Sequence, residues 1–222
     1  MRAFHFLSKQ HALQALRNQR LKVARFSDLN DPFELLAADL SDLQARGAFI
    51  KWKTQTSKKI GLLCFSMGWK NPLLWSHYGD RHRGVALEFE IDEGLVVPVR
   101  YPLNRLRLNI PHIRASGGFT EDLAEQLAST KSKHWEYEEE VRVPVDLSEC
   151  VLESGLHFET LTEQVKVVGV VLGALSQVTS HEVGCSLPRG RQATLHRARM
   201  AFRSFSIVRN RAIPVELIDG TA

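Results

Sequence analysis

The chain has 222 residues, of which 44% are hydrophobic and 24% are charged, and its formal net charge is +4. This composition is that of an ordinary globular protein, and it excludes disordered, collagen-like and disulfide-dense chains. No apolar run approaches the roughly 20 residues that a transmembrane helix needs. We therefore expect no membrane association. The three cysteines lie far apart and form no motif, so we also expect no disulfide framework and no metal site. A location in the reducing cytoplasm fits this use of cysteine best.

Strands and helices alternate irregularly in the first half of the chain. Residues 3–8 and 21–26 are predicted to be strands, and a helix over 9–20 can be capped by Ser8. A second helix is predicted to begin at Pro32, because Asp31 fits its N-cap and Glu34 fits the capping-box position. Further elements are predicted at 59–67 (strand), 72–78 (helix, N-cap Asn71), 83–91 and 95–101 (strands), and 119–133 (helix, N-cap Thr120).

The second half consists mostly of predicted strands. They are placed at residues 135–145, 165–173, 192–198 and 203–208. Regular alternation of strand and helix is absent, so a doubly wound parallel sheet is not indicated. We therefore predict one α+β domain over residues 1–222, with a mixed, split β-sheet and a few flanking helices.

Basic residues are concentrated near the C-terminal end. Seven arginines and no acidic residue occur between positions 189 and 211. Such a strip attracts the phosphates of nucleic acid or of a dinucleotide, but without other evidence a solvated positive surface is the favoured explanation. The arginines predicted to contact nucleic acid are Arg189, Arg191, Arg197 and Arg199.

Three consecutive glutamates, Glu138 to Glu140, precede a valine-rich run. In a strand over 135–145 the side chains would alternate between two faces. Glu139 would then share the apolar face with the valines, whereas Glu138, Glu140 and Arg142 would share the other. Glu140 fits a solvated surface least well, because a carboxylate that enters a sheet core needs a partner or a chemical role. Arg142 can be that partner, so both interpretations stay open.

Several motifs resemble one bacterial family. They include NDPFE at residues 30–34, WSHY and HRG within 75–84, and HWEYEEEVR at 134–142. In this order they resemble DUF2971, a bacterial family described only as a domain of unknown function. The resemblance runs from the N-terminus to about residue 173 and leaves the basic, strand-rich part at 174–222 uncovered.

The DUF2971 family is distantly similar to the ADP-ribosyltransferases, including those that modify DNA bases. The resemblance therefore implies an ADP-ribosyltransferase-like fold that uses NAD as substrate, with Glu140 as the catalytic carboxylate and Glu138 beside it. Cleavage of the nicotinamide–ribose bond builds positive charge on the sugar, which a fixed carboxylate stabilises. The residues that the resemblance implies for NAD binding are His5, Phe6, Phe65, Ser66 and Arg83, with Arg25 as the alternative to Arg83.

One position departs from the family pattern. Leu7 stands where the family usually has a threonine, which removes an expected hydrogen bond to NAD. Two hypotheses follow. The first is an ADP-ribosyltransferase that modifies a nucleic acid or a protein, in phage defence or as a toxin. The second is a module of the same fold that binds nucleic acid or a nucleotide without catalysis.

Overall fold

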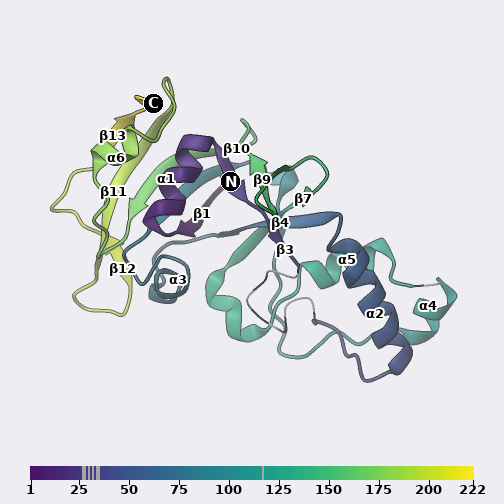
Figure 1. Cartoon of the computed structure of the whole chain (residues 1–222). Helices are drawn as coiled ribbons and strands as arrows, with labels where there is room; N and C mark the ends of the chain where they lie inside the picture. Colours follow the sequence, from purple (N-terminus) through teal and green to yellow (C-terminus); the bar gives the residue numbers. More distant parts are fainter. Residues whose placement is uncertain (27–28, 30, 32, 34–35, 117) are drawn as a thin grey trace. The chain divides into compact units, whose positions relative to one another are not determined.

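The structure, a computed structural model, describes residues 1–26, 29, 31, 33, 36–116 and 118–222, with only the backbone described for Arg114 and Glu121. The chain forms two compact units, each assembled from separate parts of the sequence (Figure 1). The first comprises residues 1–21, 65–95 and 160–222, and the second comprises 22–64 and 96–159. The predicted limit of the family-like region, near residue 173, therefore falls inside the first unit.

The first unit is built on a mixed sheet with the strand order β12-β11-β10-β5-β1. Strands β10 and β11 are parallel, the other neighbours are antiparallel, and β13 pairs with β11. Alternating apolar residues bury one face of β5, as predicted. The strands are β1 (Arg2–Leu7), β5 (Val85–Ile91), β10 (Val165–Leu172), β11 (Gln192–Met200), β12 (Ile207–Arg209) and β13 (Glu216–Asp219).

Short capped helices accompany this sheet. The predicted N-caps are confirmed, because the Ser8 hydroxyl accepts from the His11 N–H and the Asn71 side chain accepts from the Leu73 N–H. Helix α1 packs against β1 and β5, and α6 packs against β13. The helices are α1 (Lys9–Asn18), α3 (Pro72–His77), the 3₁₀ helix η1 (Glu93–Leu95) and α6 (Ser180–Gly184).

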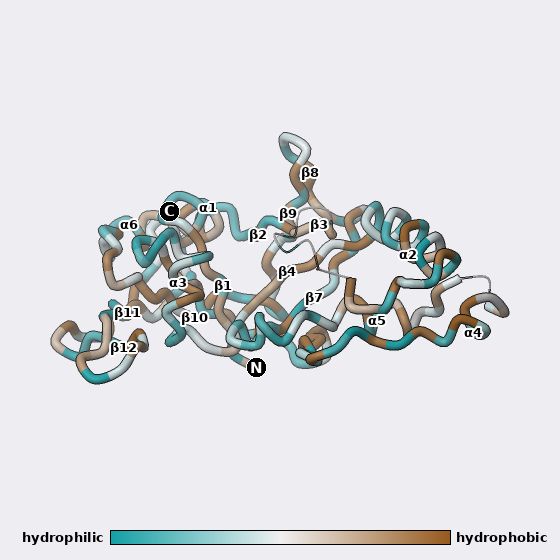
Figure 2. Tube along the Cα trace, turned by 90° about the horizontal axis from the view of Figure 1, so that it is seen from below, coloured by the Kyte–Doolittle hydropathy of each residue, from teal (hydrophilic) through white to brown (hydrophobic). Residues whose placement is uncertain are grey.

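The second unit contains a smaller sheet in the order β4-β7-β6, and β3 pairs with β4. Figure 2 shows β4 as a largely hydrophobic stretch, as expected for a buried strand. Leu62 of β4 packs with Phe26, Ala38, Phe49 and Leu127 in the core of this unit. Its elements are β3 (Ala24–Arg25), α2 (Leu43–Thr56), β6 (Val97–Pro98), α4 (Ile110–Ala115), α5 (Glu121–Ala128), η2 (Lys133–Glu138), β7 (Glu140–Asp146) and β8 (Val151–Glu153).

Three strands carry the chain across the boundary between the units. Strand β4 (Ile60–Ser66) belongs to the second unit up to Cys64, and its Ser66 faces Phe4 of β1 in the first. Strands β2 (Arg20–Lys22) and β9 (Leu156–Thr160) also cross it, and they form a three-stranded sheet with β8. The helices and the sheet with both parallel and antiparallel neighbours confirm the predicted α+β class with a mixed sheet.

Two predicted elements begin well after the expected residue, and a third, the strand predicted over 135–145, is described with the candidate site. The helix predicted from Pro32 is not helical over residues 36–42, and α2 begins only at Leu43, where the Asp42 carboxylate caps the Gln44 and Ala45 N–H groups. Pro32 and Glu34 lie outside the described residues. The strand predicted over 203–208 begins only at Ile207, because residues 201–206 form the turn between β11 and β12. Within the described ranges, every helix is too short or too polar to cross a bilayer.

Candidate active site

The glutamate run does not form one continuous strand. Residues 133–138 form the 3₁₀ helix η2, and Glu139 adopts a left-handed conformation with φ 44° before β7 begins at Glu140. The predicted alternation therefore holds only from Glu140 onwards. Glu139 is exposed, which agrees with the solvated interpretation of this residue, and its left-handed backbone interrupts the strand pattern that would have placed it on the apolar face.

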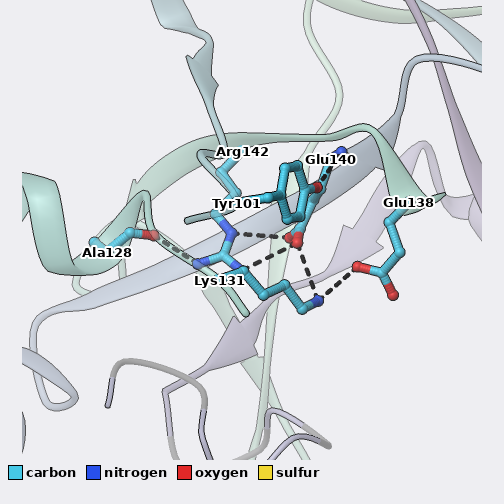
Figure 3. Close-up of polar contacts among 6 residues, drawn as sticks. All are labelled: Tyr101, Ala128, Lys131, Glu138, Glu140 and Arg142. Atoms are coloured by element: carbon cyan, nitrogen blue, oxygen red, sulfur yellow. Dashed lines mark hydrogen bonds and ion pairs between the residues drawn. The ribbon is translucent and has the colours of Figure 1, made fainter. Parts of the chain in front are cut away.

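Two of the three carboxylates enter the interior of the second unit. Glu138 and Glu140 are 4% and 6% exposed, and both bind the ammonium group of Lys131 (Figure 3). The Lys131 Nζ lies 2.6 Å from Glu138 Oε2 and 3.1 Å from Glu140 Oε2. Glu136, by contrast, is exposed and pairs with Lys133 at the surface, as the solvated interpretation predicted.

Arg142 completes the group. Its Nε and Nη2 donate to the two oxygens of Glu140 over 2.8 Å and 3.1 Å, and its Nη1 donates to the Ala128 carbonyl oxygen over 2.5 Å. The Tyr101 hydroxyl accepts from the Glu140 backbone N–H over 2.7 Å. We name Lys131, Glu138, Glu140 and Arg142 the buried ion cluster, which contains two negative and two positive formal charges.

The electrostatics of the cluster keep Glu140 ionised. Burial raises the pKa of its carboxyl group, but Arg142 and then Lys131 outweigh burial and lower the pKa to about 2. The Cys64 thiol also hydrogen-bonds this carboxylate. Burial raises the pKa of Tyr101, and the negative charge of Glu140 raises it further. The Tyr101 side chain therefore stays a neutral phenol.

The structure therefore answers the question that the sequence left open about Glu140. Its carboxylate is paired with Arg142, but inside the protein and not on a wet surface. A buried pair of this kind repays the cost of desolvation only when each partner is present, and removal of one partner costs about 3–5 kcal/mol. Pairing explains how Glu140 is tolerated there, but it does not explain why a second carboxylate lies beside it.

A hollow of about 360 Å³ adjoins the cluster within the second unit. Lys131 lines it, and its Nζ lies 5.0 Å from the centre of the Trp135 ring. Phe33 also lines it, with the Arg105 guanidinium 5.5 Å from its ring centre. The other lining residues are Asp31, Leu36, Ala37, Pro102, Leu103, Asn104, Thr130, Ser132 and His134. Aromatic rings beside cations suit a ligand with a flat base and phosphates.

The residues predicted to bind NAD lie mostly in the first unit. His5 of β1 is half-buried, and its ring meets the buried Phe65 edge to face, with 5.7 Å between ring centres. Phe6 packs against Trp75, and Ser66 is buried opposite Phe4. His5 and Phe65, both implied for NAD binding by the resemblance, are thus in contact. Since Glu138 and Glu140 belong to the second unit, the single cleft predicted for all of these residues stays a prediction.

The two arginines proposed for the pyrophosphate also lie in different units. Arg83 of the first unit is exposed, and its Nη2 lies 3.9 Å from Asp80 Oδ1. Arg25 forms part of β3 in the second unit and is half-buried. Leu7, which replaces the usual threonine of the family, ends β1 and is half-buried.

The predicted nucleic-acid arginines differ in what they contact. Arg197 donates to the backbone oxygens of Ser176 and Val178, which gives it a structural task. Arg191 pairs with the exposed Glu163 over 2.8 Å. Arg189 is exposed, and Arg199 stacks on Phe202.

Sequence reasoning missed Lys131 and Tyr101. Lys131 lies in the polar segment STKSK, where a lysine is expected to be solvated. Its position is fixed by the backbone, because the Lys131 backbone N–H donates to the Arg100 carbonyl oxygen. Nothing in the spacing of the residues indicates that it meets Glu138 and Glu140. No family model, no curated protein and no solved structure matches this chain.

Proposed function

We propose that the protein is an NAD-dependent ADP-ribosyltransferase-like enzyme with Glu138 and Glu140 as its functional carboxylates. One observation carries the proposal: two buried carboxylates share the ammonium group of Lys131, which also lines a hollow of about 360 Å³. The ADP-ribosyltransferase-like form of the α+β fold, an acceptor that is a nucleic acid or a protein, and a role in phage defence or as a toxin belong to the same proposal.

The cluster supplies the charge that this chemistry requires. Cleavage of the nicotinamide–ribose bond develops positive charge on the ribose, and fixed anionic groups in a dry site stabilise such charge. Glu140 is ionised throughout the physiological pH range because its pKa is lowered to about 2. It therefore acts electrostatically and not as a proton donor. Glu138, which is held by Lys131, lies nearby to contact the acceptor.

Lys131 links the carboxylates to the ligand. With both glutamates, Lys131 and Arg142 in place, the formal charges of the cluster cancel. A lysine ammonium on its flexible stem can exchange a carboxylate for a phosphate. When Lys131 turns towards a pyrophosphate in the hollow, one net negative charge remains on Glu138, Glu140 and Arg142. Substrate binding would thus create the anionic site that catalysis uses.

The hollow has residues that fit part of NAD. Its volume falls in the range of small-molecule sites. Trp135 and Phe33 provide faces for a base or a nicotinamide ring, and Arg105 provides a phosphate partner. The roles of His5, Phe6, Phe65, Ser66 and Arg83 in NAD binding stay a prediction from the family resemblance.

A transfer assay tests this function. Purified protein is incubated with biotin-labelled NAD and either a single-stranded oligonucleotide or a bacterial lysate, and labelled product and released nicotinamide are quantified. We expect Glu138→Gln to lower product formation by about a hundredfold or more, because it removes the second carboxylate charge of the site and with it the proposed contact to the acceptor. Glu139→Gln is the matched control, since Glu139 is the exposed neighbour of both carboxylates.

Three results would contradict the proposal. They are a wild-type protein that releases no nicotinamide and labels no acceptor, a Glu138→Gln variant with full activity, and an equal loss of activity in Glu139→Gln. Urea unfolding of both variants separates a lost function from a lost fold. A wild-type protein without activity contradicts the proposal directly, because no substitution that could unfold the protein is involved.

A further inference from the structure

The turn between β11 and β12 displays large apolar side chains to solvent. Phe202 and Phe205 are 89% and 102% exposed, and Met200 is 58% exposed. We name residues 199–207 the aromatic hairpin. Figure 2 shows hydrophobic and hydrophilic residues close together in this turn. Apolar groups gathered at one exposed place commonly mark a binding surface.

The backbone of the aromatic hairpin is well held. The Ala201 N–H donates to the Ser206 carbonyl oxygen over 2.9 Å, and the hydroxyl groups of Ser204 and Ser206 lie 2.7 Å apart. The Ile207 N–H donates to the Lys70 carbonyl oxygen over 2.8 Å. The two phenylalanines are thus presented from a fixed frame, which lowers the entropy lost when a partner binds.

Arginines occur in and next to the aromatic hairpin, and one of them contacts a ring. The Arg199 guanidinium lies 4.2 Å from the centre of the Phe202 ring. Arg203, Arg209 and Arg211 are exposed. The stretch from 189 to 211, which the structure describes throughout, contains no aspartate or glutamate. The surface therefore complements a polyanion.

A hollow of about 560 Å³ lies beside the hairpin within the first unit, lined by Phe202, Phe205, both hairpin serines and His82. The Nδ1 of His82 is buried and has no hydrogen-bond partner among the described residues. The imidazole at the wall of this hollow therefore has a nitrogen to which the described residues offer no hydrogen bond.

His82 is held in an unusual turn. Asp80, Arg81 and His82 have φ values of 47°, 53° and 67°, which non-glycine residues rarely adopt in succession. The turn is fixed because the His82 N–H donates to the Trp75 carbonyl oxygen and the His82 carbonyl oxygen accepts from the Leu175 N–H. Strained backbone that its surroundings enforce is frequent at binding sites.

From these observations we propose that the aromatic hairpin and His82 form a docking surface for single-stranded nucleic acid. Bases stack on Phe202 and Phe205, the arginines contact the phosphates, and His82 with the hairpin serines offers hydrogen bonds to base edges. A duplex is disfavoured because its bases are already stacked. A lipid surface would cover the rings and its headgroup phosphates would contact the arginines, but it has no flat base to stack on Phe202 and Phe205 and no base edge for His82 and the hairpin serines. The proposal does not depend on NAD chemistry, because none of these residues belongs to the buried ion cluster or lines the hollow beside it.

The experiment measures fluorescence anisotropy of labelled 20-mers, (dT) and (rU), with the full chain at about 50–200 mM salt, the range over which phosphate contacts weaken. We expect the double variant Phe202→Ala/Phe205→Ala to bind on the order of tenfold to a hundredfold more weakly. Arg203→Ala should lower the slope of log K against log salt by about 0.7, the contribution of one phosphate on a single strand. Leu217→Ala, a change at an exposed residue of β13, is the control and should bind like the wild type.

Several outcomes would overturn the proposal. They are no binding of either 20-mer, binding that the double phenylalanine variant leaves unchanged, and duplex binding that equals single-strand binding. Binding to vesicles of phosphatidylglycerol and phosphatidylcholine is measured to test for a lipid partner. Analytical sedimentation is measured to test for association with a second copy of the chain. Loss of vesicle binding or of a dimer in the double variant, with oligonucleotide binding intact, would assign the surface to a lipid or to a second copy.

Discussion

The buried ion cluster and the aromatic hairpin depart from the usual placement of side chains in opposite ways. In the second unit, two carboxylates, an ammonium and a guanidinium group are enclosed. In the first unit, two phenylalanine rings lie in water. Charges are seldom buried without a partner, and large apolar side chains are seldom clustered on the surface. The comparison teaches that each departure has its own energetic cost and needs its own explanation.

The two features differ in how they relate to stability. Each charge of the cluster is needed by the others, so the fold depends on the whole set. The hairpin rings contribute little to the folded state because water surrounds them as it does in the unfolded chain. Substitutions in the cluster should therefore change stability and function together, whereas substitutions in the hairpin should change binding alone.

The largest effect on stability is expected from Arg142→Met. This change leaves Glu140 buried with only Lys131 as a charged partner, and it should lower the free energy of unfolding by about 3–5 kcal/mol. Urea unfolding measures it. Lys133→Met is the matched control, since Lys133 pairs with Glu136 at the surface, and it should stay within about 1 kcal/mol of the wild type. Equal losses in both variants would contradict the structural importance of the cluster.

A double variant sharpens the same comparison. Glu140→Leu/Arg142→Met replaces the pair by apolar groups and should recover most of the stability that Arg142→Met loses, because no unpaired charge remains. If it also lacks NAD chemistry, the pair is retained for function and not for folding. A double variant as unstable as the single one would show that the apolar replacements do not pack.

Acid should weaken the cluster in a defined pH range. The pKa of Glu140 is lowered from 4.5 to about 2 on folding, so its contribution is complete above pH 4.5 and is lost as the pH falls towards 2. The loss should be on the order of 3 kcal/mol at full protonation. Glu140→Gln should lack this part of the acid dependence, although other carboxylates keep theirs in both proteins. Unfolding curves between about pH 5 and pH 2 test this, and parallel curves for the two proteins would refute it.

Local signals predicted much of the fold. Apolar periodicity placed β1, β4, β5, β10 and β11, and the caps Ser8, Asn71 and Thr120 marked where α1, α3 and α5 begin. These features depend on neighbouring residues, and a sequence displays such neighbours directly. The start of α2 was misplaced because Asp31 and Asp42 carry the same capping signal, and only the Asp42 carboxylate caps the helix.

The candidate site was harder to predict than the fold. The glutamate run drew attention to Glu138 and Glu140, and Arg142 was available as a partner two residues later. Lys131 was missed because its position depends on a backbone contact with Arg100, which is distant in sequence. The exposure of Glu139 agrees with the solvated interpretation, but the break in the strand there was missed because a left-handed glutamate has no marker in the sequence.

The smallest effect on stability is expected in the aromatic hairpin. The double variant Phe202→Ala/Phe205→Ala should change the free energy of unfolding by no more than about 0.5 kcal/mol per site, as is usual for exposed positions. The hairpin backbone does not depend on the rings, because its hydrogen bonds join Ala201 to Ser206 and Ile207 to Lys70. Urea unfolding checks this, with Leu217→Ala as the control. A loss as large as that of Arg142→Met would mean that the rings are covered in solution, so that the hairpin would be part of a core and not a docking surface.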